Sequence, residues 1–226
     1  MKKIFIVVLL LVFFGFLAYV GIEMRDVVTS KNYTEYWQQR AFDGGDFVYV
    51  ILGDANGLGV GASNATRGYA GLLVDKIRQT NRSVKVVNLS SKDATINTVI
   101  NQQIPKIGNL KTDLVTVTVG LKDIELGNGL ESFIHDMQIL LPLLPSRVSY
   151  ISELPFTLIP IHQKDILSAN QKILELANIN GVNTVLLGDT LNKQKFDIVV
   201  YDWGMRYPND KGYSLWADAF WNTIQQ

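Results

Sequence analysis

The sequence predicts a three-layer α/β/α domain on a five-stranded parallel sheet, preceded by one N-terminal transmembrane helix. Two observations predict this class. Short apolar runs rich in Val and Ile alternate with longer segments whose apolar residues recur at helical spacing. An uninterrupted apolar run at residues 4–22 comes before all of them. Strands that alternate with helices form a parallel sheet covered on both faces, with its ligand crevice beyond the carboxyl ends of the strands.

The N-terminal apolar run is long enough to cross a membrane. Its 19 residues, Ile4–Ile22, would form a helix of about 28 Å, against a hydrocarbon core of about 30 Å. Lys2 and Lys3 predict a cytoplasmic N-terminus and an extracytoplasmic domain. The alternative is a cleaved signal peptide and a secreted protein. Against it, the run exceeds the usual 7–15 residues and no clear Ala-x-Ala site follows.

Three parts are expected: a membrane anchor at 1–24, a juxtamembrane spacer at 25–45 and one domain at 46–226. The spacer is polar and mixed, contains Tyr33, Tyr36 and Trp37, and has room for a short helix. Asp43-Gly44-Gly45-Asp46 then breaks the pattern and marks the start of the domain.

Five short runs rich in β-branched residues are expected as buried strands; in chain order they are 47–52, 84–89, 114–119, 148–152 and 182–187. Five segments with apolar residues on one helical face are expected between and after them: 69–77, 95–107, 130–144, 163–180 and 210–224. Pro142 limits the end of the third helix, and Asn180-Gly181 stops the fourth.

Composition excludes several classes of function. The chain is 47% hydrophobic and 19% charged, which is ordinary for a globular domain. Its formal net charge of zero gives no electrostatic basis for binding nucleic acid. It has no cysteine, so disulfides and thiolate metal sites are excluded. We expect no cofactor and no polybasic membrane patch.

Four blocks follow predicted strands and occur in a fixed order: Gly53-Asp54-Ala55 with Gly59-Val60-Gly61-Ala62 after it, 87–95, 113–123 and 207–213. Together they resemble the SGNH/GDSL hydrolases, in particular the thioesterase/arylesterase branch. The resemblance covers nearly all of 47–224. It implies a flavodoxin-like sheet and ester or acyl hydrolysis.

The resemblance also implies four catalytic positions, and all four are substituted. In the family a serine attacks the ester, a glycine N–H and an asparagine side chain hold the oxyanion, and a histidine is the base. An aspartate three residues before the histidine usually orients it. The matching residues are Ala55, Asp93, Lys122 and Tyr207, with Gly204 at the aspartate position and Asp202 two residues out of register.

These substitutions predict a protein without serine esterase activity. Ala55 has no hydroxyl to act as nucleophile. Loss of one oxyanion donor alone lowers rates by about 10²–10³. Tyr207, with an ordinary pKa near 10, is a poor base at neutral pH. We therefore expect a binding or structural role, with an unknown protein, glycan or lipid as ligand.

Two other functions remain open at this stage. One is an ester or acyl hydrolase with a non-standard site, for which Ser63, Ser90, His135 and His162 are the available residues. The other is a carbohydrate- or lipid-binding module whose crevice is lined by aromatic residues near the last block: Trp203, Tyr207, Tyr213 and Trp216. Asn56, Lys122 and Tyr207 are the expected binding residues.

The acid and the base at the oxyanion positions have two interpretations. Asp93 and Lys122 either form a partly buried ion pair that fills the former hole, or they point to solvent and pair loosely. The resemblance gives Asp54 and Asp123 the role of bracing the loops by hydrogen bonds. An oxygen-ligand metal site from Asp54, Asp93, Asp123 and Asp202 is conceivable, but no regular ligand spacing supports it, and no metal is expected.

Overall fold

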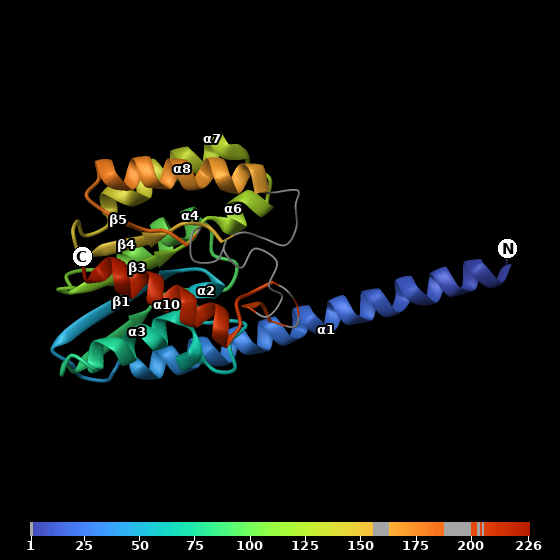
Figure 1. The fold of residues 1–226 in the computed structure, drawn as a ribbon, viewed down its shortest axis with the longest axis horizontal. Helices are drawn as coiled ribbons and strands as arrows, with labels where there is room; N and C mark the ends of the chain where they lie inside the picture. The colour runs from blue at the N-terminus through green and yellow to red at the C-terminus, as the bar shows by residue number, and fades with distance from the viewer. Residues whose placement is uncertain (1, 156–162, 188–199, 203, 205) are drawn as a thin grey trace.

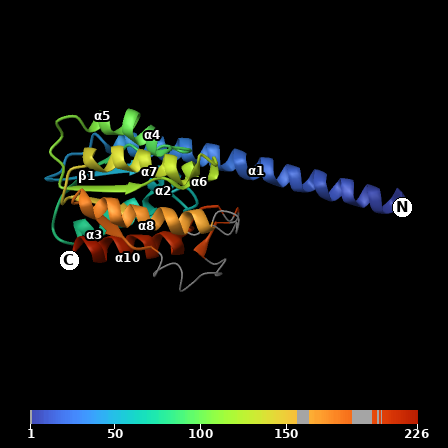
Figure 2. The ribbon, with the colours of Figure 1, turned by 90° about the horizontal axis from the view of Figure 1, so that it is seen from above.

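The computed structural model describes residues 2–155, 163–187, 200–202, 204 and 206–226. Their strands and helices form three layers, a sheet with helices packed on each of its faces (Figure 1). One very long N-terminal helix runs along the domain and then protrudes from it (Figures 1 and 2).

The central sheet has five parallel strands in the order β2-β1-β3-β4-β5. The strands are β1 (Phe47–Gly53), β2 (Val84–Asn88), β3 (Leu114–Thr118), β4 (Ser149–Ser152) and β5 (Asn183–Val185). This is the flavodoxin-like order expected from the sequence. The central strand β3 is buried along its whole length. β5 ends at Val185, two residues before the expected end.

One face of the sheet is covered by α3 (Tyr69–Arg78), α10 (Asp210–Ile224) and part of the N-terminal helix α1 (Lys2–Arg40). Aromatic rings fill this layer. The ring of Tyr69 stacks on that of Phe220 with centroids 4.9 Å apart, and Trp216 is fully buried beside them. Trp216 therefore packs α10 against the sheet.

The other face is covered by α7 (Gly129–Leu140), which continues into η3 (Leu141–Leu143), and by α8 (Gln163–Ile179). The expected single helix at 95–107 is divided into α4 (Ile96–Thr98), a π-helical segment η2 (Val99–Gln103) and α5 (Ile104–Ile107). Pro105 has no amide hydrogen to continue the ladder. Gln103 is buried, and its side-chain amide exchanges two hydrogen bonds with the backbone of Gly53 at 2.8 and 2.9 Å.

The segment expected as a polar spacer, residues 25–45, is mostly helix. α1 continues without a break to Arg40, and its second half packs on the domain. Asp26, Ser30, Tyr33 and Trp37 recur at alternating spacings of four and three and lie on the face that contacts the domain. Trp37 is only 3% exposed and donates from Nε1 to the carbonyl of Leu58 at 3.1 Å.

The first half of α1 is apolar and exposed. It contains an 18-residue window of mean hydropathy 2.5, none of which is buried. By length and composition α1 can cross a membrane, although a signal sequence would meet the same criteria.

Candidate functional site

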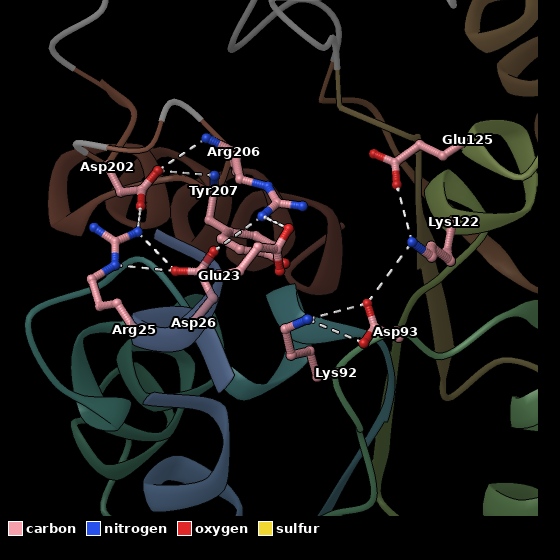
Figure 3. Close-up of polar contacts among 10 residues, drawn as sticks. All are labelled: Glu23, Arg25, Asp26, Lys92, Asp93, Lys122, Glu125, Asp202, Arg206 and Tyr207. Carbon is pink, nitrogen blue, oxygen red and sulfur yellow. Dashed lines mark hydrogen bonds and ion pairs between the residues drawn. The ribbon is translucent and has the colours of Figure 1, made fainter. Parts of the chain in front are cut away.

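The carboxyl edge of the sheet brings together the four positions that the resemblance matches to the family's catalytic residues. β1 leads to Ala55 in α2 (Ala55–Leu58), β2 leads to Asp93, and β3 leads to Lys122 in α6 (Leu121–Glu125). The segment before α10 brings Tyr207 to the same edge (Figure 3). A Cβ on Gly61 would lie 2.7 Å from Cβ of Tyr207, so the loop after α2 packs directly on the last block. Parallel strands thus produce the convergence predicted from the sequence.

Ala55 lies at the start of α2 and is 4% exposed. Asp54 caps this short helix, because its Oδ1 accepts from the backbone amide of Asn56 at 2.9 Å and from the Asn56 side chain at 3.0 Å. Burial raises the pKa of Asp54 to about 7, although the hydrogen bonds from Asn56 oppose the rise. The loop therefore keeps its supporting hydrogen bonds around a side chain that has no nucleophilic atom.

Asp93 and Lys122 form a loose ion pair at the surface. Nζ of Lys122 lies 3.9 Å from Oδ1 of Asp93 and 3.7 Å from Glu125, while Lys92 approaches Asp93 to 3.1 Å (Figure 3). The Asp93 side chain is 61% exposed. Of the two interpretations of this pair, the loose one agrees with the distance and with the exposure of Asp93, whereas the Lys122 side chain is 32% exposed and thus half-buried. Asp93 also has φ = 52°, a backbone conformation that suits the glycine of the resembled family.

Tyr207 is half-buried, and burial raises the pKa of its phenol, with the Arg206 guanidinium opposing the rise. A phenol with a raised pKa is protonated at neutral pH and cannot act as a general base there. Next to it, Oδ1 of Asp202 accepts from the backbone amides of Arg206 and Tyr207 at 3.0 and 3.2 Å. Asp202 thus holds the turn that carries Tyr207.

A charged cluster joins α1 to this turn, and sequence reasoning missed it. Arg25 pairs with Asp202 and with Asp26, and Arg206 pairs with Glu23 at 2.5 Å (Figure 3). Asp26 is almost completely buried and receives two hydrogen bonds from Arg25, at 2.8 and 3.1 Å. The signal present in the sequence is the helical spacing of Asp26, Ser30, Tyr33 and Trp37, which predicts one face of a helix.

Gly204, the position of the orienting aspartate in the resembled family, packs against α1. A Cβ at Gly204 would lie 3.0 Å from Ile22 Cγ2 and 3.2 Å from Nη2 of Arg25. A side chain at this position would therefore require the side chains of Ile22 and Arg25 to shift.

The other candidate nucleophiles and bases do not come together. Ser63 donates to the carboxylate of Asp210 at 2.7 Å, as a turn residue would. Ser90 is buried, and its Oγ has no hydrogen-bond partner among the described residues. His135 is exposed on α7. His162 lies outside the described residues.

Asp123 has the bracing role that the resemblance gave it. It is buried, and it accepts from the amide of Ile96 at 3.1 Å, which fixes the start of α4 to α6. Burial raises its pKa to about 6, against the effect of the hydrogen bond from Ile96. Within the described ranges, no group of three or more His, Asp or Glu side chains could hold a metal ion.

A hollow of about 500 Å³ lies beside the last block, lined by the following residues: Arg25, Gly61, Ser63, Tyr201, Asp202, Asn209, Asp210 and Lys211. It adjoins α1 and does not include Ala55, Asp93 or Lys122. Of the four expected crevice aromatics, Tyr213 and Trp216 are fully buried, and Trp203 lies outside the described residues. Tyr213 instead donates to the carbonyl of Val60 at 2.6 Å.

Solved structures resemble this fold closely. Esterase EstA from Pseudoalteromonas sp. has a TM-score of 0.63 at 16% identity, covering 80% of this chain and 97% of its own. The acetylxylan esterase Axe2 from Geobacillus stearothermophilus has a TM-score of 0.66 at 15% identity, over 81% and 96%. A G-D-S-L lipolytic protein from Veillonella parvula has 0.67 at 14% identity, over 80% and 99%.

No protein-family model matches the sequence, and no curated protein matches it. The fold is therefore recognised through structure and through the four short blocks. The chain has the fold of the SGNH/GDSL hydrolases, with a candidate membrane-spanning helix at its N-terminus.

Proposed function

We propose that the protein is a membrane-anchored, extracytoplasmic SGNH-fold pseudoenzyme that binds a protein, glycan or lipid and does not hydrolyse esters by serine chemistry. The observation that carries the proposal is Ala55. It occupies the start of the helix after β1, where the resembled family has its nucleophile, and the surrounding loop is fully supported by hydrogen bonds. The Asp54 cap of this loop is present, while Ala55 has no hydroxyl that could attack an ester.

The other substituted positions support the same proposal. Lys122 stands in place of the neutral asparagine donor, and Asp93 keeps the backbone amide of the glycine but adds a carboxylate that pairs loosely with Lys122. Tyr207 has a phenol whose pKa is raised by burial, so it does not take the proton that a histidine would take. Each of these changes alone would lower the rate of an esterase. When catalytic residues act as one unit, the enzyme loses nearly all of its activity on removal of the nucleophile alone.

Ester hydrolysis by the full-length protein in detergent tests the proposal. We expect p-nitrophenyl acetate and longer acyl esters to turn over at the rate of buffer alone. The matched positive control is the variant with Ala55→Ser, Asp93→Gly, Lys122→Asn and Tyr207→His, which we expect to show weak hydrolysis. Gly204→Asp is left out because that position packs on Ile22. Wild-type turnover above background that one point mutation abolishes would overturn the proposal.

A second candidate function, ester or acyl hydrolysis at a non-standard site, has one observation in its favour. The buried Oγ of Ser90 has no described partner and borders α2, since a Cβ on Gly57 would lie 2.1 Å from it. Ser90→Ala belongs in the same ester panel. Turnover that disappears in Ser90→Ala would favour this second function.

A further inference from the structure

The N-terminal helix is fixed to the domain over its second half. Between Ile22 and Asp43 the sequence has no glycine or proline, so no helix-breaking residue interrupts it there. Tyr33 donates to the carbonyl of Ala62 at 2.8 Å and Trp37 to that of Leu58 at 3.1 Å. The apolar half of α1 and the half that packs on the domain thus form one continuous helix. The direction of this helix therefore sets the orientation of the domain.

α1 runs antiparallel to β1. Its Glu23 and Arg25 contact Arg206 and Asp202 at the carboxyl edge of the sheet, while the helix ends at Arg40, shortly before β1 begins. The protruding half of α1 leaves the domain at the end where α6 lies, in both views (Figures 1 and 2). The carboxyl edge is therefore the end of the domain nearest to the apolar half of α1.

The distance between the apolar run and this edge is short. Ile22 ends the apolar run, and Arg25 follows three residues later, a rise of about 4.5 Å. The headgroup layer of one leaflet is roughly 5–8 Å thick. On the side of α1 that faces away from the domain, the next residues are still apolar and more than half exposed: Met24, Val27 and Val28. The carboxyl edge consequently lies at the depth of the headgroups.

Charge does not explain this placement. The edge carries basic and acidic side chains in similar numbers, and most of them pair with one another (Figure 3). An anionic surface would gain little from such an edge. The orientation therefore comes from the helix and should not need anionic lipid.

We infer that the carboxyl edge of the sheet, with Asp93, Lys122 and Tyr207, faces the headgroup layer of the membrane that α1 enters, so that the bilayer surface is the partner of this edge. The inference rests on the proposed role of α1 as an uncleaved anchor. Access to the candidate site is then from the membrane surface.

Depth-dependent quenching in vesicles tests the inference. The chain has no cysteine, so each introduced cysteine is the single labelling site. Leu126→Cys and Lys111→Cys flank the two ends of β3 and are both exposed. Each full-length variant carries a fluorophore and is reconstituted in phosphatidylcholine vesicles that contain lipid with a nitroxide on the headgroup. We expect quenching to be several-fold stronger at 126 than at 111.

A second pair of labels, on α1, tests whether the difference in quenching is a property of the whole domain or only of the surroundings of Leu126. Val28→Cys and Gln38→Cys are both exposed and lie about 15 Å apart along the helix. Stronger quenching at 28 than at 38 is expected. Equal quenching within each pair, or stronger quenching at 111 and 38, would overturn the inference.

The same vesicles distinguish an error in the proposed membrane anchor from an error in the inferred orientation of the domain. Extraction of the protein by alkaline carbonate would show that α1 is not a membrane span, and this would overturn both the anchor and the inference. Ester turnover by a protein that shows the expected quenching would overturn the pseudoenzyme proposal and leave the orientation intact.

Discussion

Trp37→Ala should unfold the domain at a markedly lower temperature, because α1 is part of its core. Trp37 is 3% exposed within the aromatic layer and donates to the carbonyl of Leu58. Truncation of a buried tryptophan costs about 3–5 kcal/mol, and it would also leave a buried carbonyl without its donor. For a domain of this size, each kcal/mol lowers Tm by about 2–4 °C, so a fall of about 10 °C is expected.

Thermal unfolding of the full-length protein in detergent, followed by far-ultraviolet circular dichroism, measures this effect. Gln38→Ala is the matched control, since Gln38 is the exposed neighbour on the same helix and should change Tm by less than about 2 °C. Trp37→Phe keeps most of the apolar contact and loses the hydrogen bond, so it should fall between the two. A Tm for Trp37→Ala equal to that of Gln38→Ala would refute the docking of α1.

Three other effects follow from the site. Asp54 has a folded-state pKa of about 7 against an ordinary value near 4, so between these pH values the folded state binds one more proton than the unfolded state. The free energy of unfolding should therefore fall by at most about 4 kcal/mol as the pH rises from 4 to 7. Denaturant titrations of Asp54→Asn should show a smaller fall. Asp93→Ala or Lys122→Ala should change the free energy of unfolding by less than about 1 kcal/mol, because the pair is loose and lies at the surface; a loss above 2 kcal/mol would contradict the loose pairing. Gly61→Ala should lower the free energy of unfolding by about 2 kcal/mol or more in the same titrations. Gly61 has φ = 99°, and the added Cβ would lie 2.5 Å from the carbonyl oxygen of Pro208. Gly44→Ala is the control and should have little effect, because the space around Gly44 is open.

The strands of the sheet could be predicted because parallel strands are continuous apolar runs that carry their own signal, whereas the strand order was expected only from the resemblance to the SGNH/GDSL hydrolases. β3 shows this best: 114–118 is entirely buried, and its residues are almost all β-branched. A helix was predicted at 95–107, and the structure has helical segments there, but they are divided into α4, the π-helical η2 and α5. Pro105 is a local signal for the break in this helix, whereas the hydrogen bonds between Gln103 and the backbone of Gly53 join residues 50 positions apart, which a local pattern does not contain.

The convergence of the site positions could be predicted, but their surroundings could not. Ala55, Asp93 and Lys122 each follow a strand end, so topology alone places them together. The role of α1 depends on tertiary contacts such as that of Arg25 with Asp202, 177 positions away in the sequence. In sequence these residues look like an ordinary polar stretch after a membrane anchor. Only the regular spacing of Asp26, Ser30, Tyr33 and Trp37 indicates a buried face.

The central claim is that this SGNH fold holds no serine nucleophile, and covalent labelling tests it most directly. Intact-mass spectrometry after incubation with a fluorophosphonate reports whether any side chain of the full-length protein becomes phosphonylated. We expect the mass of the wild-type protein to be unchanged, and the Ala55→Ser, Asp93→Gly, Lys122→Asn and Tyr207→His variant to gain one adduct. A stoichiometric adduct on the wild-type protein would contradict the account, and peptide mapping would identify the nucleophile.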